Sequence, residues 1–270
     1  MLNKVGIIGG GNLGSAIAEG LIQSGYLSPG HILITRRSVD QLHQLERKGA
    51  MVSSNNEDAL EYAPLVILAV KPFQVEEVLT RLKGKFKKGK HVLVSVVTGV
   101  SIQQLSSLVP EGIPIVRAMP NTAIAIRESM TCLSAKDLNA DQFQEILEMF
   151  NQLGSAVKID EKLMDAATVL GACGTAFAMR YIRANIQGGI EIGFDAATAS
   201  LIAAQTVKGA SELLLKKQTH PEQEIDKVTS PSGCTIAGLN EMEHNGFSSA
   251  MIKGIKLSAD KAGDLYQKED

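Results

Sequence analysis

The sequence predicts an α/β fold in which an N-terminal Rossmann-type, doubly wound parallel sheet is followed by an all-α domain. Two observations support this prediction. Over the first 120 residues, short segments rich in Val and Ile alternate with amphipathic helical patterns, which is typical of a parallel sheet with right-handed crossovers. The pattern changes beyond about Asn139, and from Glu161 onward helical patterns rich in Ala, Gly and Leu run almost unbroken, as in a helix bundle.

The expected strands are four to six residues long, and several lack the polar alternation of a half-exposed strand, as in sheets covered on both faces. They are Val5–Ile8, Ile32–Thr35, Leu65–Val70, Val92–Val97 and Ile113–Ala118. The helical patterns between them are Asn12–Ser24, Val39–Lys48, Phe73–Lys83 and Ile102–Leu108.

The second half continues with a helix over Asp141–Gln152 and a short strand at Ala156–Ile159. Further helices are expected at Glu161–Leu170, Thr175–Ile192, Ala196–Lys216, Thr235–His244 and Ser248–Tyr266. Three glycines lie inside these patterns: Gly188, Gly189 and Gly209. Each destabilises a helix by about 1 kcal/mol relative to Ala. Their presence therefore indicates close helix–helix contact. The boundary is expected near residues 159–161, giving domains 1–159 and 160–270.

Composition excludes several classes of protein. The 27 Lys and Arg against 29 Asp and Glu leave a formal charge of −2, which argues against nucleic acid or anionic lipid as a partner. No apolar stretch of about 20 residues lies outside the patterned segments, so no membrane span is expected. The scattered Cys132, Cys173 and Cys234 indicate a reducing compartment, the cytoplasm, and the five histidines show no metal-ligand spacing.

A glycine-rich turn follows the first expected strand. Gly9, Gly11 and Gly14 satisfy the pattern G-x-G-x-x-G between an apolar strand and an amphipathic helix, the context of a dinucleotide-binding turn. Gly9 would permit the tight turn, Gly11 the approach of a pyrophosphate, and Gly14 close packing of the helix on the sheet. Free N–H groups at the helix start would bind the phosphates. The alternative is a tight turn without a ligand.

The end of the second expected strand bears on the choice of dinucleotide. NAD-binding proteins usually place Asp or Glu there, whereas this chain has Thr35-Arg36-Arg37-Ser38. Two guanidinium groups and two hydroxyls suit the 2′-phosphate of NADP(H), with NAD(H) as a weaker alternative. A solvated pair of surface arginines is the other interpretation.

Two more strand ends should face the same ligand, because ligands of open α/β sheets bind outside the carboxyl ends of the strands. These are Ala69-Val70-Lys71-Pro72 and Ser95-Val96-Val97. Lys71 either contacts the ligand or is an ordinary surface lysine at a strand end.

Several segments together resemble the pyrroline-5-carboxylate reductase family, in order along nearly the whole chain. They are Gly9–Gly14, Asn56, Ala69–Pro72, Arg117–Thr122 and Val228–Leu239. The last segment is the most specific, because ordinary dehydrogenases have nothing similar.

This resemblance implies an oxidoreductase acting on a CH–NH group, which transfers a hydride from NADPH to the cyclic imine 1-pyrroline-5-carboxylate and gives L-proline. It also makes the helical domain a dimerisation domain, shared between two subunits of a homodimer or higher oligomer. The implied cofactor residues are Gly11, Asn12 and Leu13 under the pyrophosphate; Arg36 and Arg37 at the adenosine phosphate; Asn56, Ala69, Val70, Lys71 and Pro72 along the dinucleotide; and Ser95, Val96 and Val97 beside the nicotinamide.

The implied substrate site combines two segments. Met119 and Asn121 would close one wall, and Ser230, Ser232, Gly233, Cys234 and Thr235 would bind the imino acid. The latter segment has the layout of a helix start, whose free N–H groups suit a carboxylate, although a plain helix cap has the same layout. By resemblance, Thr235 is the catalytic residue, hydrogen-bonded to the ring nitrogen, and Ser230 helps to hold the carboxylate.

The chain also departs from the family. Ala172-Cys173-Gly174-Thr175-Ala176-Phe177 stands where the family usually reads Gly-Ser-Gly-Pro-Ala-Tyr, Ala123 replaces a proline, and Ser232 replaces a glycine. Two other functions therefore stay open. A β-hydroxyacid dehydrogenase would carry a catalytic lysine where this chain has Arg180, which cannot shuttle protons at neutral pH. A non-catalytic or altered-specificity NADP-binding paralogue is the second alternative.

Overall fold

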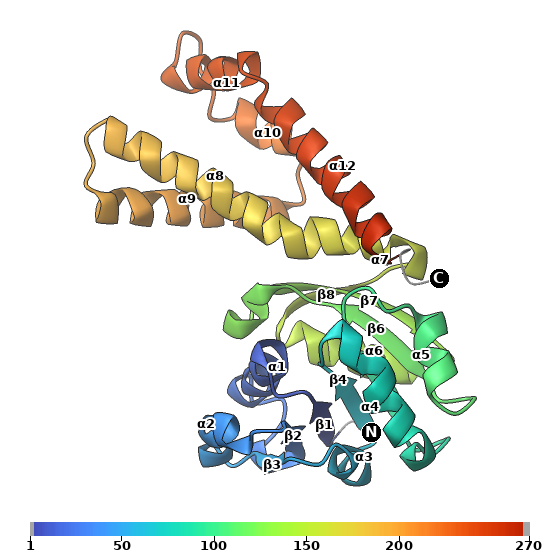
Figure 1. The fold of residues 1–270 in the computed structure, drawn as a ribbon. Helices are drawn as coiled ribbons and strands as arrows, with labels where there is room; N and C mark the ends of the chain where they lie inside the picture. The colour runs from blue at the N-terminus through green and yellow to red at the C-terminus, as the bar shows by residue number, and fades with distance from the viewer. Residues whose placement is uncertain (1–2, 267–270) are drawn as a thin grey trace. The chain divides into compact units, whose positions relative to one another are not determined.

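The computed structural model describes residues 3–266 and divides into two compact units (Figure 1). Of the described residues, the first unit contains 3–173 and 261–266, and the second contains Gly174–Asp260. No helix of the described residues is long and apolar enough to cross a membrane.

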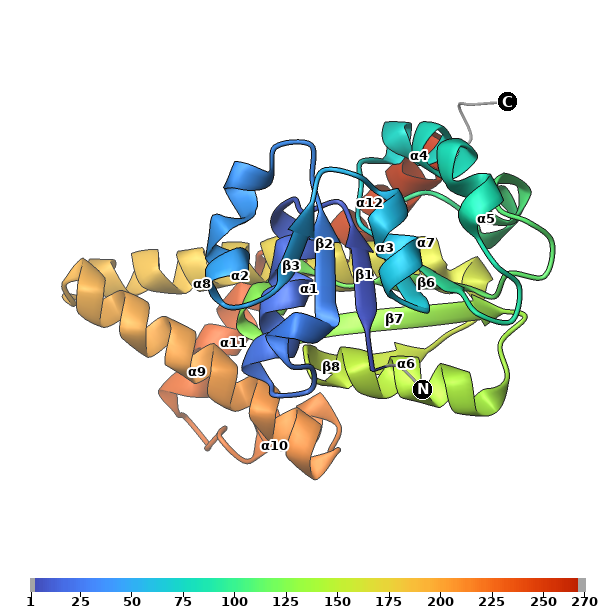
Figure 2. The same cartoon turned by 90° about the horizontal axis from the view of Figure 1, so that it is seen from below.

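The first unit is built on one eight-stranded sheet with strand order β3-β2-β1-β4-β5-β6-β7-β8. Its strands are β1 Val5–Ile8, β2 Ile32–Thr35, β3 Met51–Ser53, β4 Leu65–Leu68, β5 Val92–Ser95, β6 Ile115–Met119, β7 Ser129–Lys136 and β8 Gly154–Lys158. All neighbours pair in parallel except β6 and β7, which are antiparallel. Figure 2 shows β1, β2 and β3 side by side.

Helices cover both faces of this sheet. They are α1 Asn12–Gln23, α2 His43–Arg47, α3 Glu57–Tyr62, α4 Val75–Leu82, α5 Ile102–Leu108, α6 Ala140–Asn151 and α7 Met164–Ala167. On one face, α1, α2 and α6 pack on Ile7, Ile34 and Val94; on the other, α3, α4 and α5 pack on Ile8 and Leu68. Two aliphatic cores on one sheet confirm the predicted doubly wound fold.

The sheet departs from the all-parallel prediction at β7, which the sequence analysis missed. Ser129 and Thr131 of this strand are buried, whereas Met130 between them is exposed. With polar residues buried and an apolar residue exposed, the segment does not have the pattern of a strand in a hydrophobic core. The short β3 and α3 were also not predicted. The strands expected to reach Val70 and Val97 end two residues earlier, at Leu68 and Ser95.

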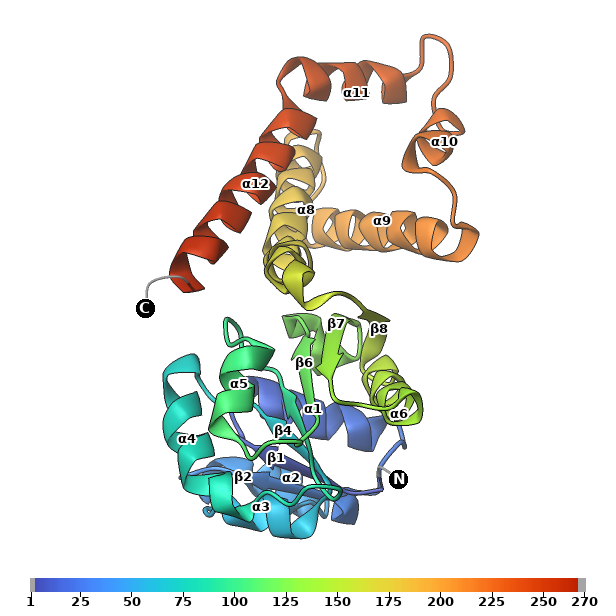
Figure 3. The same cartoon turned by 90° about the vertical axis from the view of Figure 1, so that its right-hand side faces the viewer.

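The second unit consists of helices: α8 Gly174–Glu191, α9 Ala196–Lys217, α10 Pro221–Asp226, α11 Cys234–His244 and most of α12 Phe247–Tyr266 (Figure 3). Of these, α10 was not expected. Asp195 caps α9, accepting hydrogen bonds from the backbone N–H groups of Ala197 at 3.0 Å and Thr198 at 3.1 Å.

The glycines inside these helices differ in their surroundings. A Cβ added to Gly189 would lie 3.2 Å from the Cβ of Ala199, so close packing of α8 on α9 explains this glycine. Around Gly188 and Gly209, nothing lies within 4 Å of such an atom. The expected helix–helix contact is therefore absent at these two glycines within the described part of a single chain.

The segment between the last strand and α8 belongs to the first compact unit. It contains the 3-10 turn Glu161–Leu163, α7, and a π-helical stretch over Thr168–Cys173. The predicted boundary after residue 159 lies directly after β8, whereas the compact unit continues to Cys173. The assignment of residues 160–173 to the helical domain stays a prediction.

Candidate active site

A cavity of about 970 Å³ opens at the carboxyl ends of β1 to β5. It lies where the strand order reverses between β1 and β4, which is the usual ligand site of a doubly wound sheet. The loops that line it are Gly9–Leu13, Thr35–Ser38, Ser54–Glu57, Ala69–Pro72 and Val96–Thr98, joined by Gln41 and by Gln74, Glu77, Val78, Arg81 and Leu82.

The glycine-rich turn is open on the side that faces the cavity. On its other side it packs so closely that Gly9 and Gly14 have no room for a side chain. Gly9 has φ +109°, and a Cβ there would lie 2.5 Å from the carbonyl oxygen of Ala69. A Cβ on Gly14 would lie 2.1 Å from the carbonyl oxygen of Gly9. Gly11 faces open space, and α1 begins after it with no side-chain cap and no acidic residue in its first turn. The turn therefore fits a pyrophosphate bound by backbone N–H groups.

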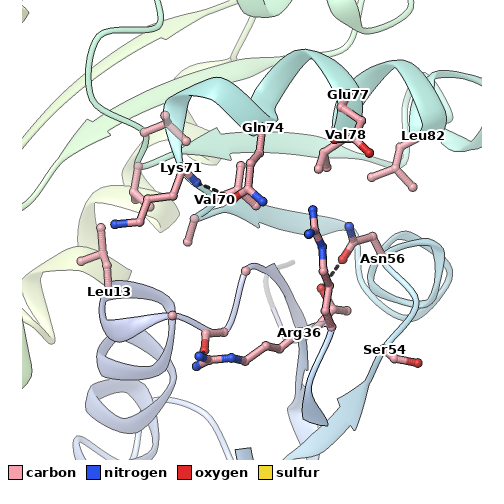
Figure 4. Close-up of a pocket in the computed structure, with 18 of the residues that line it drawn as sticks. Leu13, Arg36, Ser54, Asn56, Val70, Lys71, Gln74, Glu77, Val78 and Leu82 are labelled. Carbon is pink, nitrogen blue, oxygen red and sulfur yellow. Dashed lines mark hydrogen bonds between the residues drawn. The ribbon is translucent and has the colours of Figure 1, made fainter. Parts of the chain in front are cut away.

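The two arginines after β2 are held differently. Arg36 is half-buried and donates hydrogen bonds to the carbonyl oxygen of Gly10 and to Oε1 of Gln41 (Figure 4). Arg37 is exposed and has no hydrogen bond or ion pair among the described residues. Arg36 thus braces the glycine-rich turn, whereas the guanidinium of Arg37 is available to an anion.

The end of β3 is tied to the end of β2. The backbone N–H of Arg36 donates to the carbonyl oxygen of Ser53 at 3.0 Å. The buried Thr35 hydroxyl donates to Oδ1 of Asn56 at 2.5 Å, which leaves the Asn56 amide nitrogen free to donate elsewhere. In Figure 4, Asn56 and Ser54 lie across the cavity from Val78 and Leu82 of α4. We call this part the adenosine end of the cavity, because it adjoins the strand end at which doubly wound proteins recognise a ribose; adenosine binding here stays a prediction.

Lys71 lies at the other part of the cavity, after β4. Its backbone N–H donates to Oε1 of Gln74 at 3.2 Å, which fixes the turn that leads into α4. Figure 4 shows the exposed Lys71 side chain extending across the cavity toward Leu13. The position suits contact with a phosphate or a nicotinamide ribose.

Two expected cofactor residues do not line the cavity. Gly14 is buried beneath the turn, and the fully buried Ser95 accepts a hydrogen bond from the backbone N–H of Val97 at 3.3 Å. Both support the wall from behind. Conversely, the wall formed by α4 is not predicted from the sequence. Glu77, Val78 and Arg81 recur at helical spacing, and this periodicity was interpreted only as an ordinary amphipathic helix.

The candidate substrate residues of the first unit follow β6. Met119 is buried, and the Asn121 side chain is engaged at both ends. Its Oδ1 accepts from the backbone N–H of Ala123 at 3.0 Å, and its Nδ2 donates to the carbonyl oxygen of Gly171 at 3.2 Å. Asn121 therefore fixes the local backbone, and a direct role in substrate binding stays a prediction.

The remaining candidates gather at the start of α11, in the second unit. Gly233 is the N-cap residue, with φ −75° and ψ 160°, and it supplies no side-chain cap. A Cβ at Gly233 would lie 2.5 Å from Oγ of Ser230 and 3.0 Å from its carbonyl oxygen, so the turn before α11 packs closely on Gly233. Thr235 lies half-buried in a first turn without acidic residues. The first-turn N–H groups can therefore bind an anion, and binding of the substrate by this segment, as opposed to a plain helix cap without a ligand, stays a prediction.

Comparisons with known proteins match these two halves separately. Residues 4–99 match the family described as NADP oxidoreductase, coenzyme F420-dependent, and residues 161–265 match pyrroline-5-carboxylate reductase dimerisation. Pyrroline-5-carboxylate reductase 2 of Dictyostelium discoideum is 44% identical over an alignment of 277 positions, which covers 96% of this chain and 92% of that protein. The chain belongs to the pyrroline-5-carboxylate reductase family.

Two further relatives of this family are informative. Pyrroline-5-carboxylate reductase 1 of Dictyostelium discoideum is 48% identical over 98% of this chain, which spans only 50% of that protein's length. The crystal structure of Plasmodium falciparum pyrroline carboxylate reductase with NADP bound superposes with a TM-score of 0.86 at 26% identity, covering 98% of each chain. The family fold therefore extends over nearly the whole chain.

At Ser232, the departure from the reductase family pattern has a structural consequence. Ser232 has φ +59°, in the left-handed region that the usual glycine occupies without strain. At Phe177, an apolar side chain lines a groove of about 330 Å³ between α8 and α12, together with Tyr181 and Met251. The fold accommodates both departures.

Proposed function

We propose that this chain catalyses the NADPH-dependent reduction of 1-pyrroline-5-carboxylate to L-proline, the last step of proline biosynthesis. The observation that carries the proposal is the Ser230–Thr235 segment, whose uncapped helix start suits an imino-acid carboxylate, in a chain that also has a dinucleotide cavity. Family membership supports the same reaction. The chain spans only half the length of one curated relative. We therefore propose the activity from the residues of this chain, and not from that relative's name.

The cavity supports NADP(H) as the cofactor. Its glycine-rich turn fits the pyrophosphate, and after β2 it presents Arg36, Arg37 and Ser38 without a carboxylate. The Plasmodium falciparum relative was solved with NADP bound. NAD(H) would lack the 2′-phosphate that pairs with the free guanidinium of Arg37, and we therefore expect it to bind more weakly.

The reaction asks the protein mainly for orientation. When bound, NADPH supplies the hydride. The C5 carbon of the protonated imine is already electrophilic, so catalysis requires it to be held about 3–3.5 Å from the hydride donor. Ala69–Pro72 and Val96–Val97 form the cavity walls beside the expected nicotinamide position.

Thr235 and the start of α11 would hold the substrate. The first-turn N–H groups and Ser230 would bind its carboxylate, and the Thr235 hydroxyl would hydrogen-bond the ring nitrogen. An aliphatic hydroxyl is a poor general acid at neutral pH, so we assign Thr235 a positioning hydrogen bond and let the imine arrive protonated or take its proton from water.

We also infer that the chain assembles as a homodimer or a higher homo-oligomer. Within the described chain, α8 has no buried residue. Large apolar side chains are exposed on α8, α9 and α12: Met179 is 62% exposed, Leu201 71% and Leu257 61%. Such a surface indicates a protein partner, and the dimerisation profile over residues 161–265 indicates a second copy. Sedimentation equilibrium tests this inference, and a monomer at micromolar concentration would contradict it.

One assay separates the proposed function from its alternatives. Loss of NADPH absorbance is followed with 1-pyrroline-5-carboxylate, beside NADH with the same imine and NADP with a hydroxyacid. Turnover of the imine is expected. Oxidation of the hydroxyacid instead would favour a β-hydroxyacid dehydrogenase, and NADPH binding without turnover would favour a non-catalytic paralogue.

Cys132, Cys173 and Cys234 are free thiols, which supports the inferred cytoplasmic location.

A further inference from the structure

We propose that Lys85 determines the preference for NADPH by neutralising Glu57, a carboxylate at the adenosine end of the cavity. The proposal rests on the proposed NADPH-dependent function and adds a specificity-determining residue that does not itself line the cavity.

Glu57 is placed where a negative charge matters. It lines the cavity at the start of α3, directly after Asn56, and so belongs to the same end as Arg36 and Arg37. The hydrogen bonds from Arg36 to Ser53 and from Thr35 to Asn56 keep these two loops together. NAD-binding proteins use a carboxylate at the end of the second strand, which in this chain adjoins Glu57 across the Thr35–Asn56 hydrogen bond, to favour a ribose hydroxyl. An unpaired Glu57 would therefore repel the 2′-phosphate.

Lys85 cancels this charge. Its Nζ lies 2.6 Å from Oε2 of Glu57, and the two side chains are 45% and 38% exposed. The hydrogen bond to Glu57 raises the pKa of Lys85 above its ordinary value, followed by the attraction of the same carboxylate, so the lysine remains charged at neutral pH. The 3-10 turn Lys83–Lys85 packs against α3, which holds the pair together.

The second carboxylate of the cavity is neutralised in the same manner. Glu77 lies 2.9 Å from Arg81, one turn further along α4. With both carboxylates paired, Arg36, Arg37 and Lys71 remain as lining cations without a carboxylate partner among the described residues. Each carboxylate that lines the cavity is therefore balanced by a neighbouring cation, which leaves the lining suited to a phosphorylated dinucleotide.

The test uses fragments of the cofactor, so that it does not depend on turnover. Adenosine 2′,5′-bisphosphate and adenosine 5′-monophosphate are titrated calorimetrically into the full chain, and the ratio of their dissociation constants isolates the 2′-phosphate. Lys85→Met should weaken binding of the bisphosphate about 3- to 10-fold at low salt, because it leaves a carboxylate facing a dianion, with little effect on the monophosphate.

The double variant distinguishes neutralisation from a direct contact. Glu57→Gln combined with Lys85→Met should restore the wild-type ratio, because the carboxylate that Lys85 neutralises is gone. Lys88→Met is the matched control: it removes a charge from the same lysine-rich segment, and Lys88 has no salt bridge among the described residues. It should leave both affinities within about twofold.

The outcomes are separable. If Lys85→Met has no effect, or if the double variant loses as much affinity as Lys85→Met alone, the proposal is overturned. If the wild-type chain prefers the bisphosphate and the variants behave as expected, but the imine is not reduced, the inference holds and the proposed function fails. If the wild-type chain does not prefer the bisphosphate, both are overturned.

Discussion

Arg117 of β6, only 5% exposed, forms an ion pair with Asp165 of α7, with Nη2 and Oδ1 separated by 3.4 Å. Glu161 lies 3.7 Å from the other terminal nitrogen of the guanidinium, and its carboxylate also accepts a 2.6 Å hydrogen bond from the backbone N–H of Ile102. The Nε of Arg117 has no hydrogen-bond partner among the described residues. This buried cation therefore depends on two carboxylates from the segment that follows β8.

Removing both carboxylate charges should be costly. Glu161→Gln with Asp165→Asn preserves the side-chain shapes and the hydrogen bond to Ile102, but leaves the guanidinium buried without a counter-charge. We expect a loss of about 2–4 kcal/mol in the free energy of unfolding, measured in urea. Lys162→Gln disrupts only the exposed pair with Asp160 and should cost less than about 0.5 kcal/mol. Similar losses in both variants would contradict this account.

Ser232→Gly should stabilise the protein. Ser232 is held at φ +59°, which costs an L-residue about 1–2 kcal/mol and glycine almost nothing. Glycine also increases the conformational entropy of the unfolded chain, which offsets part of this gain. We therefore expect a net gain of about 0.5 kcal/mol in the free energy of unfolding. Ser28→Gly, at an exposed residue with φ −65° and no cap hydrogen bond, should instead lose stability. Equal losses at both sites would refute the strain at Ser232.

Stability should fall below about pH 6.5 through His91. The ring is buried; Nδ1 accepts from the backbone N–H of Lys87 at 2.9 Å, and Nε2 donates to the carbonyl oxygen of Leu60 at 2.9 Å. Burial lowers the pKa of His91 below its ordinary value, and the nearby charges of Lys90 and Lys87 lower it further, against the raising effect of the Leu60 carbonyl.

Because the unfolded chain then binds the proton more readily, stability declines as pH falls from the ordinary pKa toward the lowered one, by at most about 1.4 kcal/mol per pH unit. His91→Asn keeps one donor and one acceptor and should remove this decline between pH 7 and pH 5. Unfolding free energies of both proteins across that range provide the check, and parallel curves would exclude His91 as the cause.

The two arginines after β2 should differ in their effects on the cofactor. Arg37→Ala should raise the Michaelis constant for NADPH about tenfold or more and change that for NADH little, because its free guanidinium is available to the 2′-phosphate. Arg36→Ala should weaken both cofactors by similar factors, because Arg36 braces the turn through Gly10. Steady-state kinetics with each cofactor distinguish the two, and identical profiles would show that the arginines share one function.

Thr235→Ala should lower the turnover number about tenfold or more while leaving the dissociation constant for NADPH unchanged, because the lost hydroxyl orients the imine and not the cofactor. Thr235→Ser retains the hydroxyl and should recover most of the activity. Calorimetric titration of NADPH provides the second readout. A weakened affinity for NADPH in Thr235→Ala would mean that this segment contacts the cofactor.

Much of the fold can be predicted from the sequence because the patterns that indicate it lie within short, contiguous segments. The apolar strand Val5–Ile8, the glycines and α1 follow one another directly, and the structure confirms them to within a residue. Strand β7 could not be recognised, because Ser129 and Thr131 face the interior. Their hydroxyls lie 3.3 Å apart, and Ser129 accepts from the backbone N–H of Asn121.

The site could be predicted from the sequence where its residues follow strand ends, but not where it depends on tertiary pairing. Residues after β1, β2, β4 and β5 were predicted because parallel strands end at one edge of the sheet. The contribution of Val78 and Leu82 was hidden, since apolar helix residues at this spacing normally indicate core. The pairing of Glu57 with Lys85 depends on how α3 packs, which no local pattern encodes.

The absence of buried side chains on α8 within the described chain has a consequence for how the molecule is handled. A helix that gains its apolar contacts from a second copy is stabilised by mass action, so its melting temperature rises with protein concentration. Dilution to the nanomolar concentrations of a sensitive assay would then shift molecules toward the dissociated state. Specific activity would fall with dilution, although every catalytic residue remains in the chain.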